Sequence, residues 1–257
     1  MEERVNSTPP ASTSMVTVQV YTYYRLADAL AAAWLGADHV GIAVLSREPG
    51  AAEVYLSDPE WRRIFQLTTP QRVAEIFARL KGVSKRVLMP LASSIEGALG
   101  LLDEAGGDIL HTINQWGPRE YSELRASAGV EVMASIFITP GGWDENRAEV
   151  ERALALDREG AVDYLLLDTR LRDWRGVTGR THNWSISRYI ARHTETPVIL
   201  AGGLNHGNVA QALDAVEPWG VDACTGLDAS PGVKDLTKVW RFIQEARRWE
   251  ARHRRSA

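Results

Sequence analysis

Residues 163–226 decide the fold: DYLLLDTRLRDWRGVTGRTHNWSISRYIARHTETPVILAGGLNHGNVAQALDAVEPWGVDACTG. This stretch contains three short β-rich runs, at 163–168, 197–202 and 221–226. The first two are almost continuous in apolar residues, as expected of parallel strands buried on both faces. Between the runs, apolar residues recur every three or four positions, the pattern of amphipathic helices. The stretch therefore predicts parallel strands joined by helices.

The same unit repeats towards the N-terminus. Further strand-like runs lie at 16–21, 39–45, 86–91, 108–113 and 131–138. Helical patterns lie at 25–35, 70–80, 94–105, 118–128, 145–157, 184–192, 207–216 and 233–249. Eight strands alternating with eight helices, with no linker-like break in composition, predict an α/β fold, a single (β/α)8 TIM barrel over residues 16–257. A doubly wound open sheet is the structural alternative.

Composition excludes several classes of protein. Of the 257 residues, 45% are hydrophobic and 24% charged, which is typical of a folded chain rather than a disordered one. The longest apolar stretch, residues 29–37, is far short of the roughly 20 residues that span a bilayer. The net charge of −4 leaves no overall electrostatic footprint for nucleic acid. Residues 1–15 lack the apolar segment of a secretory signal, so we expect a flexible tail on a cytoplasmic protein without membrane or nucleic-acid partners.

Loops that follow the strands carry the active sites of barrel enzymes, so candidate residues are expected there. The loop 46–69 is unusually long and predicts a lid or an insertion with a short helix around 59–65. Glycines follow the last three strands, at positions 176, 179, 202, 203 and 226. Loops after strands 7 and 8 of a barrel commonly bind phosphate through backbone N–H groups, although each glycine taken alone is also typical of a turn.

These segments resemble the phosphoribosylanthranilate isomerase family, the barrel enzymes of tryptophan biosynthesis. The family motifs are LLD, GGTG with Asp-Trp, PxxLAGGL with Asn-Val, VDxSSGVE and PGxKD. They correspond here to Leu166–Asp168, Gly176–Gly179 with Asn183-Trp184, Pro197–Leu204 with Asn208-Val209, Val221–Asp228 and Pro231–Asp235. The resemblance implies a phosphorylated sugar as substrate, no cofactor, and a phosphate site made by Thr178, Gly179, Gly202, Gly203, Thr225 and Gly226.

The resemblance also implies an Amadori rearrangement of an N-linked ribose 5-phosphate, which needs one acid and one base. The acid of the family falls on Asp168, although an aspartate there also suits a loop cap. The family's base is a cysteine in a KxCG pattern at the end of the first strand, where this chain has Gln19-Val20-Tyr21-Thr22. An unperturbed phenol supplies roughly thirtyfold less conjugate base than a thiol at neutral pH. Tyr21 therefore either acts with a lowered pKa or shapes a different ligand.

His111, at the end of the fourth strand, is the second candidate base because imidazole titrates near neutrality; it is equally typical of a hydrogen-bonded residue at the barrel mouth. Arg47 stands where the family holds the anthranilate carboxylate, but Glu48 beside it is expected to repel a carboxylate. Phe137 occupies the place of a family arginine. The only thiol, Cys224, lies on the eighth strand rather than the first.

Two aromatic residues, Trp143 and Trp174, are predicted either to stack on a planar substrate or to pack under a long loop. The histidine spacing indicates no metal site. Three functions remain open: an isomerase with a replaced base, a barrel enzyme for another ribose-phosphate adduct, and a non-catalytic phosphosugar-binding protein. The presence of an acid at Asp168 favours the two enzymes.

Overall fold

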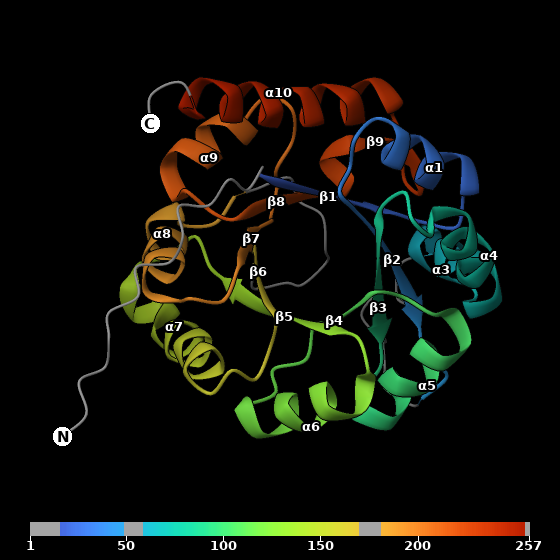
Figure 1. The fold of residues 1–257 in the computed structure, drawn as a ribbon, viewed down its shortest axis with the longest axis horizontal. Coiled ribbons are helices and arrows are strands. Elements are labelled where there is room, and N and C mark those ends of the chain that lie inside the picture. The colour runs from blue at the N-terminus through green and yellow to red at the C-terminus, as the bar shows by residue number, and fades with distance from the viewer. Residues whose placement is uncertain (1–15, 49–58, 170–180, 255–257) are drawn as a thin grey trace.

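The computed structural model describes residues 16–48, 59–169 and 181–254, and its centre is a closed barrel. Eight parallel strands pair in chain order, and the eighth pairs with the first along Thr17–Val20 and Gly220–Ala223. Figure 1 shows the helices as an outer ring around these strands. The predicted single (β/α)8 barrel is confirmed, and the open doubly wound sheet is wrong because the last strand closes on the first.

The strands are short and buried. They are β1 (Thr17–Thr22), β2 (His39–Leu45), β3 (Lys85–Leu91), β4 (Ile109–Thr112), β5 (Glu131–Ile138), β6 (Tyr164–Thr169), β7 (Val198–Leu200) and β8 (Gly220–Ala223). The outer helices are α1 (Leu26–Trp34), α4 (Pro70–Leu80), α5 (Ile95–Ala105), α6 (Pro118–Ala128), α7 (Trp143–Arg158), α8 (Trp184–His193), α9 (Val209–Val216) and α10 (Leu236–Arg254). None of the helices in the described ranges has the length and apolar content to cross a bilayer.

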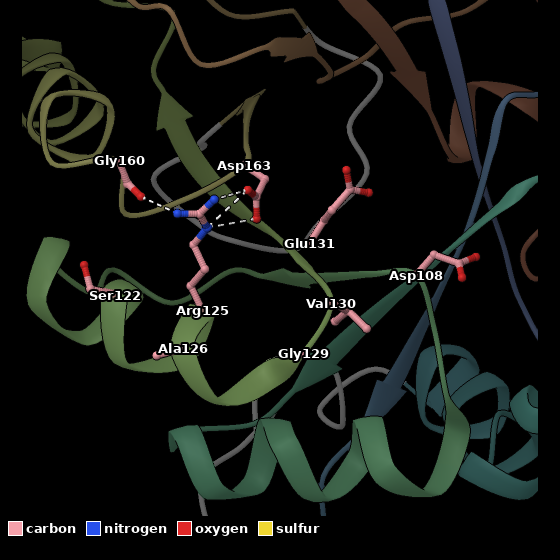
Figure 2. Close-up of a pocket in the computed structure, with 9 residues that line it drawn as sticks. All are labelled: Asp108, Ser122, Arg125, Ala126, Gly129, Val130, Glu131, Gly160 and Asp163. Atoms are coloured by element: carbon pink, nitrogen blue, oxygen red, sulfur yellow. Dashed lines mark hydrogen bonds and ion pairs between the residues drawn. The ribbon is translucent and has the colours of Figure 1, made fainter.

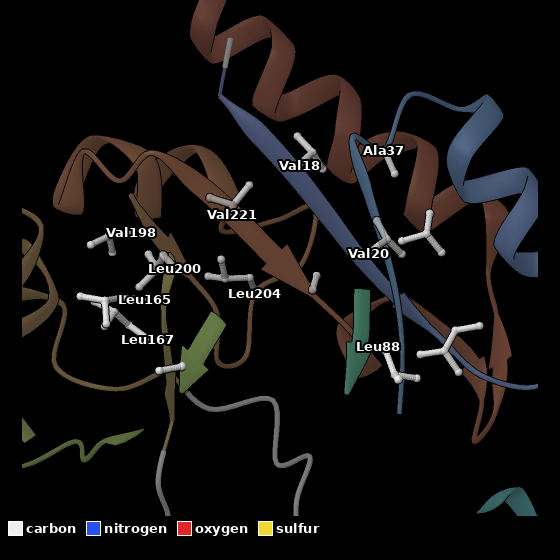
Figure 3. Close-up of a cluster of buried hydrophobic side chains, with 14 of the residues drawn as sticks. Val18, Val20, Ala37, Leu88, Leu165, Leu167, Val198, Leu200, Leu204 and Val221 are labelled. Atoms are coloured by element: carbon white, nitrogen blue, oxygen red, sulfur yellow. The ribbon is translucent and has the colours of Figure 1, made fainter. Parts of the chain in front are cut away.

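Strand alternation divides the apolar side chains into two clusters. On β1, Val18 and Val20 point outward and pack under the helices, together with residues such as Leu165 and Leu167 of β6 (Figure 3). The inward positions fill the barrel itself with Tyr21, Val87, Ile109, Met133, Tyr164, Leu166, Ile199 and Ala201. Because side chains alternate between the two faces, every second residue of a strand enters the barrel interior, and those near the strand ends form its mouth.

The long loop after β2 contains the predicted short helix, α3 (Pro59–Leu67). Its Phe65 is buried in a cluster with Leu91 and with side chains at the ends of β2, β3 and β4. Trp61 lies 5.8 Å from Tyr23, measured between ring centroids. The insertion therefore packs on the mouth of the barrel, beside the ends of β1 to β4.

The last helix begins later than the sequence pattern predicts. Val233 and Lys234 form a short strand, β10, which pairs with β9 (Asp228–Ser230) after the 3-10 turn η1 (Thr225–Leu227). Asp235 then caps α10, because its Oδ1 accepts hydrogen bonds from the backbone N–H groups of Thr237 and Lys238. The predicted start at residue 233 is wrong because the hairpin takes these two residues before the cap.

Candidate active site

Three of the predicted site residues meet at the carboxyl ends of the strands. Tyr21 is the penultimate residue of β1, His111 lies on β4 and Asp168 is the penultimate residue of β6. The Tyr21 hydroxyl lies 2.5 Å from Nδ1 of His111, and Asp168 is close enough to Tyr21 to act on its pKa. The fold therefore brings both candidate bases and the candidate acid into one barrel mouth.

The Tyr21–His111 contact continues to a third side chain. Nε2 of His111 lies 2.8 Å from Oγ of Ser135 on β5. All three side chains are buried. Burial lowers the pKa of His111 to about 3, and burial followed by the charges of Asp222, Cys224 and Asp168 raises the pKa of Tyr21 well above its usual value. The site therefore holds a neutral imidazole and a neutral phenol, and the lowered tyrosine pKa that the sequence argument required is not found.

A glycine on the neighbouring strand makes room for the phenol ring. Gly41 pairs with Tyr21 in the β1–β2 register, and a Cβ at Gly41 would lie 2.6 Å from ring atoms of Tyr21. The ring therefore lies directly over the backbone of β2. No residue with a side chain fits at position 41 while Tyr21 keeps its contact with His111.

Gly41→Ala is expected to destabilise the protein by about 1–3 kcal/mol, because the new methyl group forces the Tyr21 ring to move. Denaturant unfolding measures this loss. Gly100→Ala is the matched control, since Gly100 lies inside α5 with open space around its Cβ position, and it is expected to stabilise by about 0.5–1 kcal/mol. Equal stability of Gly41→Ala and wild type would show that the ring does not depend on this gap.

Asp168 has the titration behaviour of an acid catalyst. Burial raises its pKa to about 6, and a hydrogen bond from the backbone N–H of Thr169, 2.7 Å long, partly opposes the rise. Asp168 as a whole residue is only partly buried. At about pH 7, roughly a tenth of such a group is protonated, compared with less than about a thousandth of an ordinary aspartate.

A second carboxyl group lies deeper in the barrel. Asp222 on β8 is 6% exposed and pairs with Gln19 of β1 in the strand register. Burial and the charge of Asp168 raise the pKa of Asp222 to about 8, against the opposing effects of Gln19 and Lys234. One carboxyl oxygen of Asp222, Oδ1, accepts no hydrogen bond from the described residues. At neutral pH this group is therefore a buried, mostly neutral acid below the mouth.

The described phosphate candidates lie together after β7 and β8. Gly202 and Gly203 have φ angles of +78° and +69°, a region that favours glycine. A Cβ on Gly226 would overlap the carbonyl oxygen of Leu204, so the two loops touch through their backbones. Within the described part of the chain, the N–H groups of Gly203, Thr225 and Gly226 donate to no protein acceptor. Such unused donors at the end of a barrel suit an anion.

Two further phosphate candidates, Thr178 and Gly179, lie outside the described residues, as does Trp174.

The described residues at the ends of β6 and β7 pack closely against each other. A Cβ on Gly202 would overlap Oγ1 of Thr169, and this hydroxyl lies 3.0 Å from Nδ1 of the buried His182. Gly202 therefore has a packing role independent of any ligand.

Arg47 is exposed just after β2, and its neighbour Glu48 makes hydrogen bonds to residues that follow β3. The Glu48 carboxylate accepts hydrogen bonds from the N–H of Ser93 and the hydroxyl of Ser94, at the N-terminus of α5. These bonds lower the pKa of Glu48. Glu48 is therefore held in its ionised form at the N-terminus of α5, and its repulsion of a substrate carboxylate stays a prediction.

Cys224 follows β8 and belongs to a polar cluster at the edge of the mouth. Its Sγ lies 3.2 Å from the Tyr23 hydroxyl and 3.8 Å from Nζ of Lys234. The side chain of Lys234 is fully buried and forms an ion pair with Asp228 at 2.6 Å. Because Lys234 lies on β10 and Asp228 on β9, this ion pair joins the two strands of the hairpin and gives the lysine of the PGVKD motif a structural role. Burial raises the pKa of the Cys224 thiol to about 11, so it is a neutral packing group and not an activated base.

The aromatic and apolar candidates divide between two places. Trp143 packs edge-on against Tyr189 of α8, with ring centroids 4.8 Å apart, so it stands between two outer helices. Phe137 is buried and pairs with Asp168 in the β5–β6 register, at the level of the mouth. Helix packing therefore accounts for Trp143. Phe137 places an apolar side chain beside Asp168, at the position where the resemblance predicts an arginine.

A surface cavity of about 790 Å³ lies at the opposite end of the barrel. Figure 2 shows Arg125 of α6 directed at Asp163 and at the carbonyl of Gly160. Glu131, which also lines it, pairs with Lys85. These charges satisfy one another at the N-terminal ends of the strands, the face of a barrel that carries stability rather than catalysis.

The sequence does not by itself identify two polar residues of the barrel interior, Ser135 near the mouth and Asp222 below it. Ser135 occupies an inward position of β5, and the alternation of Met133, Ser135 and Phe137 is the signal that marks it. Asp222 belongs to the VDACTG run, where it was considered only as part of a strand. A polar residue at an inward strand position is the feature common to both.

The sequence comparisons identify one family. The family model described as "N-(5'phosphoribosyl)anthranilate (PRA) isomerase" matches residues 143–245. The N-(5'-phosphoribosyl)anthranilate isomerase of Haloferax volcanii is 35% identical over 177 residues, which cover 69% of this chain and 75% of the relative. Isomerase 1 of Methanosarcina mazei is 33% identical over 222 residues, covering 84% of this chain and 88% of the relative.

Solved structures share the fold. Phosphoribosylanthranilate isomerase of Thermotoga maritima superposes with a TM-score of 0.70 at 24% identity, covering 90% of this chain and 98% of the other. An isomerase of this kind in complex with reduced 1-(o-carboxyphenylamino)-1-deoxyribulose 5-phosphate gives a TM-score of 0.67. At this identity the structures support the barrel architecture itself.

Proposed function

This chain belongs to the N-(5'-phosphoribosyl)anthranilate isomerase family, and we propose that it catalyses the isomerisation for which the family is named, a step of tryptophan biosynthesis. The observation that carries the proposal is Asp168, an acid with a pKa of about 6 at the end of β6, in the same mouth as unused N–H donors after β7 and β8. A phosphorylated sugar derivative is the substrate that such an arrangement fits.

The reaction begins with proton transfer from Asp168. Its carboxyl proton goes to the ring oxygen of the N-linked ribose, the bond from C1 to this oxygen breaks, and the nitrogen lone pair forms a C1=N bond. A base must then take the proton from C2, so that the electron pair of the C2–H bond neutralises the nitrogen. We assign this second step to the side of the mouth where Tyr21 and His111 lie, and their mutual contact supports this assignment.

The two ends of the substrate are bound by different loops. We assign the phosphate to the backbone donors of Gly203, Thr225 and Gly226, with Gly202, Thr178 and Gly179 completing the predicted site. The carboxylate of the aglycone is assigned to Arg47, the exposed cation after β2. A guanidinium binds carboxylate through paired hydrogen bonds, which makes it suitable for this role.

The direct test is turnover of phosphoribosylanthranilate by the purified protein, followed by the loss of substrate fluorescence. Saturable turnover is expected, with competitive inhibition by the reduced product analogue. Binding of that analogue without turnover would replace the isomerase by a phosphosugar-binding protein. If the protein neither binds the analogue nor turns over phosphoribosylanthranilate, the proposed substrate is refuted.

A further inference from the structure

We propose that Tyr21, His111 and Ser135 form a proton relay that replaces the cysteine base of the family. This inference rests on the proposed isomerase function. The phenol at the end of β1 touches the substrate, the imidazole receives the phenol proton, and the serine holds the imidazole. Tyr21 is then the catalytic residue, and the other two are positioning residues that act through it.

The hydrogen-bond directions follow from the available acceptors. In the proposed relay the Tyr21 hydroxyl donates its proton to Nδ1 of His111, which is the acceptor that the described residues offer it. The neutral imidazole then carries its proton on Nε2 and donates it to Oγ of Ser135, 2.8 Å away. This is the chain of contacts expected when one side chain is activated by a second and the second is oriented by a third.

The charges of the site decide which kind of base is possible. A phenolate at Tyr21 is unfavourable at neutral pH, because burial is the main factor that raises the pKa of this phenol well above its usual value. Among the described residues no carboxylate makes a hydrogen bond to the buried His111, so an imidazolium is also unfavourable in the resting site. The site therefore offers a neutral base, and a neutral base creates no new charge when it takes a proton from a cation.

The substrate supplies that cation after ring opening. The C1=N bond carries a positive charge, and Asp168 has become a carboxylate. Tyr21 then accepts the C2 proton while its own proton passes to Nδ1 of His111, and the C2–H electrons form a C1=C2 bond that neutralises the nitrogen. The positive charge moves from substrate to imidazole, and the enolamine afterwards becomes the ketone as its C2 hydroxyl proton is lost and C1 is protonated.

The packing of the Tyr21 and His111 rings against each other supports the proposed relay. The centroids of Tyr21 and His111 are 5.9 Å apart, and Gly41 leaves the space that this position of the phenol requires. The three side chains come from β1, β4 and β5, and two successive contacts join them, Tyr21 to His111 and His111 to Ser135. A phenylalanine ring would need the same space beside Gly41, but only the tyrosine hydroxyl makes a hydrogen bond with Nδ1 of His111.

The decisive variants are Tyr21→Phe and Ser135→Ala, tested with substrate carrying deuterium at C2. Tyr21→Phe keeps the ring and is expected to lower kcat by about a hundredfold or more with little change in KM. Ser135→Ala is expected to lower kcat by roughly five- to tenfold, the effect of one orienting hydrogen bond. Both variants should raise the deuterium isotope effect on kcat above that of wild type, because the C2 proton transfer becomes more strongly rate-limiting.

Thr112→Val is the matched control, since it removes a buried strand hydroxyl that bonds to Tyr121 outside the barrel mouth. It is expected to change stability and leave the isotope effect unaltered. The pH profile gives a second readout: kcat should not rise between about pH 7 and pH 10, because the base is neutral, whereas a phenolate base would produce a rise.

The outcomes separate the relay from the function on which it rests. Full activity of Tyr21→Phe in a protein whose wild type isomerises the substrate would refute the relay alone. A rise of kcat with pH would replace it by phenolate catalysis. Absence of turnover in the wild type would refute the isomerase function and the relay together.

Discussion

Replacement of Asp168 by Asn is expected to lower kcat by about a thousandfold and to leave the affinity for the reduced product analogue nearly unchanged. The amide keeps the size of the side chain and can still accept a hydrogen bond from the backbone N–H of Thr169. It has no carboxyl proton to give to the ring oxygen, and general acid catalysis contributes roughly 10² to 10⁴ to such a step. Steady-state kinetics and calorimetric binding of the analogue measure the two quantities.

The pH dependence of the wild type provides a companion result for Asp168. Since burial raises its pKa to about 6, kcat/KM should fall as the pH rises through this value and the acid loses its proton. Asp103→Asn, on the exposed face of α5, is the control and should behave as wild type. Undiminished turnover by Asp168→Asn would remove the residue from the mechanism.

Asp222→Asn is expected to stabilise the protein by about 2–5 kcal/mol at about pH 9, and by much less near pH 4. The folded pKa of Asp222, about 8, is raised above the ordinary value of 3.8. Its stabilising contribution is therefore fully present below pH 4 and is lost as the pH rises through 8, where folding has to bury an ionised carboxylate. The amide mimics the neutral acid and avoids that loss.

Urea unfolding of both proteins across this pH range measures the difference. Asp144→Asn serves as the control, because the Asp144 side chain is 94% exposed and replacing it should produce no comparable pH-dependent gain. A difference between Asp222→Asn and wild type that did not grow with pH would show that the buried carboxyl stays neutral, or is fully compensated, in the folded protein.

The strand pattern predicts the architecture because both faces of a parallel strand are buried. Residues 163–168 contain an uninterrupted Leu165–Leu167 run, and the helices between strands show their period in residues such as Val73, Ile76 and Phe77. The pattern fails at residues 233 and 234. There the hairpin pairing of β10 with β9 overrides the helical period, and this pairing depends on contacts outside the segment.

The candidate site is predicted in part, from positions rather than contacts. Because functional residues follow barrel strands, the sequence points to Tyr21, His111 and Asp168 one at a time. It does not pair Tyr21 with His111, since 90 residues separate them and only closure of the barrel brings their side chains together. Ser135 was missed for the same reason, as a serine within a strand is unremarkable until its inward neighbour is known.

The amino-acid sequence by itself determined the barrel, the family and the strand ends at which chemistry occurs, because hydrophobic period and local motifs are properties of short segments. Only the tertiary structure decided the protonation states. The pKa values of Asp168, Asp222 and His111 all depart from their ordinary values chiefly through burial, and burial is set by residues from every part of the chain. A tyrosine in the place of a cysteine is a substitution in the sequence; its neutral, hydrogen-bonded state is a property of the closed barrel.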